Sequence, residues 1–108
     1  MDISFKKLPT WGNRAEFFYE GSIANGVLIQ FGQEKTMAEL SGQQLELLLN
    51  NFRGRTVPIG TSHDAPTKGS VGAWMVEHLG KSGLATYLGA ILISERYARK
   101  SGSEIVFF

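Results

Sequence analysis

The sequence predicts an α+β fold, with an N-terminal antiparallel β-meander in residues 1–40 and three helices with a C-terminal β-hairpin in residues 41–108. Three observations lead to this prediction. The first forty residues contain β-rich runs separated by turn residues, and three apolar stripes with helical spacing follow them. A Ser-Gly-Ser turn then precedes an apolar run that reaches Phe108. At 108 residues the chain is expected to form one domain.

Four segments at the start of the chain are candidate strands. They read "ISFKKL", "RAEFFYEGSI", "GVLIQFGQ" and "KTMAEL". Trp11 lies in a turn after the first segment. Asn25-Gly26 predicts a hairpin between the second and third segments, because both residues tolerate positive φ. A meander of three or four strands is therefore expected.

The first helix is predicted to begin after Ser41, which lies three residues before Gln44. This spacing is typical of a capping box, in which each side chain bonds the free backbone N–H of the other residue. The apolar residues that follow lie on one helical face, and they are Leu45, Leu48, Leu49 and Phe52. The next segment, "RTVPIG", predicts a short edge strand, because Pro58 has no N–H to donate to a ladder.

Two further helices are predicted, with Ser70 and Ser82 as their N-caps. The stripe of the second helix consists of Val71, Trp74, Met75, His78 and Leu79, which predicts that His78 packs in the core. The stripe of the third helix consists of Leu84, Leu88, Ile91 and Leu92, with Tyr87 beside them. Gly80 separates the two helices. The chain then closes with a hairpin of "RYARK", the turn "SGS" and "EIVFF".

The composition excludes several classes of function. With no cysteine, the chain has no disulfide, no Cys-ligated zinc and no thiol nucleophile. No apolar run approaches the roughly 20 residues that span a bilayer, and the N-terminus lacks a signal-peptide core, so a cytoplasmic protein without membrane contact is expected. His63 and Asp64 are adjacent, but no second cluster supplies further ligands or catalytic groups. We therefore expect no enzyme activity, no metal and no cofactor.

The order of elements from residue 41 onward is helix, short strand, helix, tight turn, helix, hairpin. This order resembles the winged helix–turn–helix DNA-binding domain, and the resemblance lies in "SVGAWMVEHLGKSGLATYLGAILISERYARKSGSEIVFF", residues 70–108, with the helix at 42–52 as support. The resemblance implies that residues 41–108 form a winged-helix-like unit. It also implies that the third helix enters the major groove and that the hairpin, as the wing, touches the backbone or the minor groove.

The charge distribution agrees with this resemblance. Residues 51–108 carry seven cations and four anions, whereas residues 1–50 carry four cations and six anions. The lead hypothesis is thus a small non-enzymatic regulator, acting in transcription, that binds duplex nucleic acid. Its expected contact residues lie at the helix starts and the wing, and they are Lys68, Ser70, Lys81, Ser82, Thr86, Arg96, Arg99 and Lys100.

The expected outward face of the third helix is small and apolar rather than suited to reading bases. Small residues let another backbone approach closely, so this face fits a helix of a partner or the N-terminal layer of the same chain. Ala85, Gly89 and Ile93 are the expected partner-contact residues, and a homodimer is one form of this contact. The alternative function is therefore a protein-interaction module, an adaptor or an inhibitor of another macromolecule, that reuses the winged-helix shape.

Overall fold

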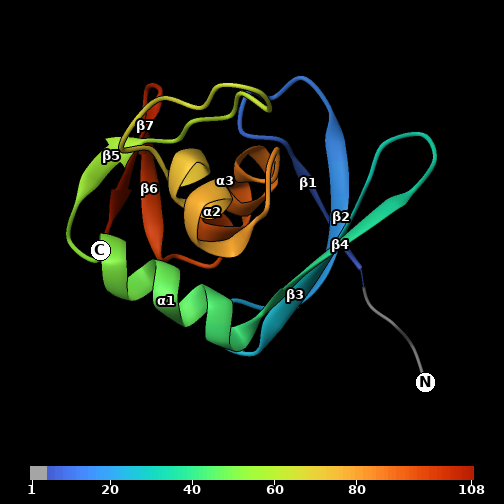
Figure 1. The fold of residues 1–108 in the computed structure, drawn as a ribbon. Helices are drawn as coiled ribbons and strands as arrows, with labels where there is room; N and C mark the ends of the chain where they lie inside the picture. The colour runs from blue at the N-terminus through green and yellow to red at the C-terminus, as the bar shows by residue number, and fades with distance from the viewer. Residues whose placement is uncertain (1–4) are drawn as a thin grey trace.

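The computed structural model describes residues 5–108 and confirms the α+β fold (Figure 1). Four antiparallel strands form the first sheet, in the order β1-β2-β3-β4, so that β1 and β4 are its edges. The strands are β1 (Lys6–Pro9), β2 (Glu16–Ser22), β3 (Gly26–Phe31) and β4 (Thr36–Ser41). All four predicted segments therefore form strands, although Ile3 and Ser4 of the first segment lie outside the described residues.

Alternate residues of this sheet face the core, as the period of two in a strand requires. The buried residues of β2, β3 and β4 are Phe17, Tyr19, Val27, Ile29 and Leu40. The residues between them face outward, and no helix or strand of residues 5–108 covers that outer face (Figure 1).

Helix α1 (Gly42–Phe52) begins with the predicted capping box. The backbone N–H of Gln44 donates to Oγ of Ser41 at 3.1 Å, and the backbone N–H of Ser41 donates to Oε1 of Gln44 at 3.0 Å. The stripe is confirmed, because Leu45, Leu48 and Phe52 are buried. The helix runs from the end of β4 toward the second sheet (Figure 1).

The second sheet has three antiparallel strands in the order β5-β7-β6. They are β5 (Thr56–Pro58), β6 (Ala98–Ser101) and β7 (Glu104–Phe107). The predicted edge position of the strand with Pro58 is confirmed, and the predicted closing hairpin is formed by β6 and β7. The first helix and this sheet are thus joined by β5, which pairs with the last strand of the chain.

Helices α2 (Val71–Leu79) and α3 (Ala85–Ser94) lie between the two sheets (Figure 1). Ser70 caps α2 as predicted, since its Oγ accepts from the N–H of Ala73 at 3.0 Å. The predicted cap at Ser82 is wrong, because α3 starts after Leu84 and has no side-chain cap. The cause is Gly83, whose φ of +74° turns the chain once more before the helix can begin.

Two kinds of contact hold α3 against the four-stranded sheet. The ring of Tyr87 lies edge-on to Phe17, with centroids 5.1 Å apart, and stacks on Phe31 at 4.6 Å. At the end of α3, the carboxylate of Glu95 accepts two hydrogen bonds, from the hydroxyl of Tyr19 at 2.8 Å and from the N–H of Ile23 at 3.0 Å. The helix is therefore anchored to the meander along its length.

The other side of α3 packs on the three-stranded sheet, where Ala98 and Ile105 are buried. Within residues 5–108, no helix is long and apolar enough to cross a membrane.

Truncation of Leu48 should test the packing of α1. Leu48 is fully buried, so Leu48→Ala is expected to lower the free energy of unfolding by roughly 2–5 kcal/mol. Leu47 on the same helix is 57% exposed, so Leu47→Ala is the matched control and should change it by less than about 0.5 kcal/mol. Urea titration measures both values, and equal losses would contradict the assigned helical face.

The Tyr19–Glu95 contact should make stability depend on alkaline pH. Burial raises the pKa of Tyr19 from 10.0 to about 12, and the hydrogen bond to Glu95 and its charge add to this shift. Between these pH values the unfolded chain releases a proton that the folded chain keeps, so stability should fall as the pH rises.

Tyr19→Phe should flatten this fall, and the slope that remains comes in part from Tyr87, whose pKa is also raised by burial. Urea unfolding at several pH values measures the slope. Identical slopes for the two proteins would show that Tyr19 does not cause it.

Candidate functional site

The predicted nucleic-acid contacts lie on several separate elements, and not all of them are accessible. Lys68 precedes α2 and Lys81 follows it, so nine helical residues, about 13 Å of helix, separate them. Ser70 is fully buried and its hydroxyl is used as the helix cap, so it cannot contact a ligand. Ser82 is exposed but outside α3, and Thr86 is half-buried, with its carbonyl accepting from the N–H of Trp11.

The cations of the closing hairpin also diverge. Arg99 and Lys100 point to opposite faces of β6, because neighbouring residues alternate in a strand. The ammonium of Lys100 turns inward, donates to the carbonyl of Trp11 at 2.6 Å and lies 4.9 Å from the centroid of its ring. Arg96, in the turn after α3, and Arg99 remain exposed. All three cations are exposed, but Lys100 is held against Trp11 whereas Arg96 and Arg99 form no ion pair within residues 5–108.

The chain itself covers two of the three predicted partner-contact residues of α3. Ala85 is 2% exposed, Gly89 is buried and Ile93 is half-buried. A Cβ atom on Gly89 would lie 2.8 Å from a ring carbon of Trp11 and 2.7 Å from Cδ1 of Ile59. Small residues on this face fit either a partner helix or the N-terminal layer of the same chain, and here Trp11 of the N-terminal layer packs against Gly89. A second copy therefore has no access to Ala85 or Gly89.

The two histidines lie at the surface. His78 is exposed and stacks on Trp74 with centroids 4.8 Å apart, so its predicted core position is wrong. The ring of His63 lies 3.3 Å from Oδ1 of Asp64, and both side chains are exposed in the loop before α2. Residues 5–108 contain no group of three or more His, Asp or Glu side chains that could hold a metal ion.

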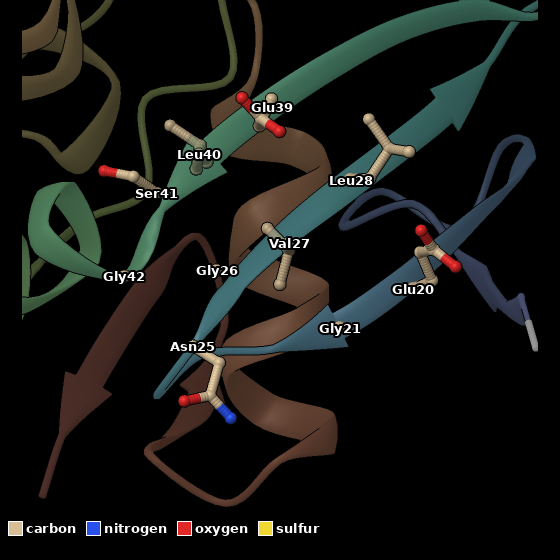
Figure 2. Close-up of a pocket in the computed structure, with 10 residues that line it drawn as sticks. All are labelled: Glu20, Gly21, Asn25, Gly26, Val27, Leu28, Glu39, Leu40, Ser41 and Gly42. Atoms are coloured by element: carbon tan, nitrogen blue, oxygen red, sulfur yellow. The ribbon is translucent and has the colours of Figure 1, made fainter.

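The structure instead presents a hollow of about 510 Å³ on the outer face of the four-stranded sheet. Glu20, Leu28 and Glu39 stand up from three neighbouring strands, and Figure 2 shows them on the face opposite α3. Their register is direct, since Glu20 pairs with Leu28 and Leu28 pairs with Glu39. Two carboxylates therefore flank one apolar side chain across the sheet.

Two glycines shape one end of this hollow. Gly21 has a φ of +94° and Gly26 a φ of +111°, and a side chain on Gly21 would collide with the carbonyl of Gly26. Because neither residue has a side chain, β2 and β3 approach closely beside the turn that joins them (Figure 2). The hollow remains open above this point.

The next cross-strand row on the same face is apolar at both ends. Phe18 pairs with Gln30, which pairs with Met37. Phe18 is 41% exposed and Met37 is 47% exposed, although both have large apolar side chains. We call the two rows together the outer sheet face, made of Phe18, Glu20, Leu28, Gln30, Met37 and Glu39.

The residues of the outer sheet face are not among those predicted from the sequence. Its signal is the alternation within "EFFYE", "VLIQ" and "MAEL", in which every second residue belongs to this face once the register is known. Comparison of the chain with protein-family models, with curated proteins and with solved structures finds no match.

The burial of Gly89 reverses the expected effect of a substitution there. In a helix interior, Gly→Ala ordinarily stabilises by roughly 0.5–1 kcal/mol. Gly89→Ala should instead destabilise, by about 1–3 kcal/mol, because the new methyl group collides with Trp11 and Ile59. Thermal unfolding measures the change.

Gly12→Ala is the control, since a Cβ at Gly12 would meet only Cγ of Arg14 at 3.9 Å. An increase in stability for Gly89→Ala would show that α3 is not packed as described.

Proposed function

We propose that this protein is a non-enzymatic protein-interaction module that binds a basic segment of another protein on its outer sheet face. The observation that carries the proposal is an uncovered sheet face on which Phe18 and Met37 are exposed in one cross-strand row. Scattered surface apolar residues need no explanation, but exposed aromatic and thioether side chains brought together on one face favour a contact surface.

The charges of the face favour a basic partner. Glu20 and Glu39 lie two strands apart, about 10 Å, with Leu28 between them. Within residues 5–108, neither carboxylate forms an ion pair. A lysine or arginine side chain has an aliphatic stem that packs on Leu28 and a charged end that reaches either carboxylate. Apolar residues of the same segment would pack on Phe18 and Met37.

Duplex nucleic-acid binding is the second candidate function. It is favoured by the order of α1, β5, α2, α3 and the hairpin, which is the order that resembles a winged helix, and by two exposed cations, Arg96 and Arg99. The burial of α3 speaks against a groove-reading helix, since only Ser94 of this helix is exposed. Binding in this form would depend on phosphate contacts of the hairpin and would carry little sequence information.

Fluorescence anisotropy with a labelled peptide of alternating lysine and leucine tests the first candidate. The double variant Glu20→Gln/Glu39→Gln should bind this peptide about three- to tenfold more weakly, because two exposed ion pairs are lost. The control, Glu46→Gln/Glu77→Gln, removes the same charge from exposed sites on α1 and α2 and should leave the affinity within about twofold.

Equal effects of the two double variants, or no binding of the peptide by the unaltered protein, would overturn the proposal. A labelled DNA duplex provides the contrast. If the duplex binds, and Arg96→Ala/Arg99→Ala reduces the salt dependence by about 0.9 per lost phosphate contact, the second candidate becomes the better supported function.

A further inference from the structure

A second hollow lies on a different part of the molecule, between the edge strands of the two sheets. Its lining residues come from β1 and the turn after it, from α3 and from β6. Its volume is about 360 Å³, within the range of about 300–1,000 Å³ in which proteins bind small molecules. We call it the Trp11 cleft, after the residue in its wall that is tied to both α3 and β6.

The walls of the Trp11 cleft are mainly apolar. Leu8 comes from β1, and Ala90 and Ile93 come from the outer side of α3. All three are only partly buried, and they pack against the core while part of each side chain remains open to the cleft. The ring of Trp11 completes the apolar lining. An apolar group in the cleft would therefore bury surface on several sides without moving the backbone.

One charge faces this apolar lining. Lys100 is the only charged residue among the described residues that line the cleft. Its ammonium has three N–H donors, and the carbonyl of Trp11 takes one of them. Neither of the ion pairs formed within residues 5–108 includes Lys100. Its positive charge is thus held in place by Trp11 and is not neutralised by a carboxylate of the described chain.

We propose that the Trp11 cleft binds a small apolar carboxylate, whose acid group pairs with Lys100 and whose hydrocarbon part packs on Leu8, Ala90 and Ile93. The charge selects an anion, because an ammonium–carboxylate hydrogen bond is stronger than a neutral one. The apolar walls select a hydrocarbon body over a polar one. This site is independent of the outer sheet face, since the two share no lining residue.

Octanoate is a suitable probe, with octanol as its uncharged counterpart. The two tryptophans give separate indole N–H signals in a ¹H–¹⁵N spectrum, and Trp74 lies on α2, away from the cleft. Octanoate should shift the Trp11 signal in a saturable way and leave the Trp74 signal unchanged. Octanol should bind about tenfold more weakly, because it lacks the charge that pairs with Lys100.

Lys100→Met keeps the aliphatic stem and removes the charge. It should weaken octanoate about tenfold and leave octanol unchanged. Arg99→Met is the matched control, since it removes a cation from the opposite face of the same strand and should leave both affinities within about twofold. Ala90→Leu fills the cleft and should abolish the binding of both compounds while Lys100 remains.

Three results would overturn the proposal. The first is the absence of a saturable shift of Trp11 with octanoate, and the second is an equal shift of Trp74, which would show non-specific binding. The third is the same loss of octanoate affinity in Lys100→Met and Arg99→Met. If Lys100→Met unfolds because the Trp11 contact is lost, unchanged octanoate binding by folded Ala90→Leu would also overturn it.

Discussion

Gly89 has no side chain, and the packing of three segments that are distant in the sequence depends on the absence of a Cβ atom at this position. Trp11 and Ile59 occupy the space that a Cβ atom would need, so the turn after β1 and the segment after β5 both meet at the middle of α3. Lys100 then bonds the carbonyl of Trp11 and brings the closing hairpin to the same point. A larger residue at position 89 would push these three segments away from α3.

The same packing determines which surfaces are left for function. Most side chains of α3 are already in contact with the two sheets, so little of this helix is left for contact with a ligand. The cations that precede and follow α2 and those of the hairpin lie on separate elements. The outer sheet face and the Trp11 cleft are two parts of the surface where apolar side chains lie beside charges that form no ion pair within residues 5–108.

Local signals made most of the fold predictable. The capping box of Ser41 and Gln44 acts over three residues, and the stripe of α1 depends only on helical spacing, so both are readable from the sequence. The directions of the side chains at the end of β6 were predictable in part, because strand alternation places Arg99 and Lys100 on opposite faces. The contact of Lys100 with Trp11 spans 89 residues and leaves no local pattern.

The incorrect and missing predictions have a common physical cause, which is that each depends on contacts between residues that are distant in the sequence. The small residues of α3 are compatible with a partner or with the chain's own meander, and nothing in the spacing of Ala85, Gly89 and Ile93 distinguishes the two. The prediction of an N-cap at Ser82 is wrong because Gly83 adopts a positive φ. This conformation depends on the loop of His63, which packs against Gly83. The outer sheet face was missed because cross-strand neighbours are known only when the register is known.

The two edges of the four-stranded sheet differ in a way that limits how copies of this protein could add to one another. β1 is short and carries Lys6, Lys7 and Pro9, residues that block the approach of a further strand. β4, with the sequence TMAELS, carries no proline and no cation, and no strand of the described chain pairs with its outer side. A further strand could therefore be added to this sheet at β4 but not at β1. Two copies that met through β4 would use up the open edge of each, so growth would stop at a pair and would not continue into a fibre.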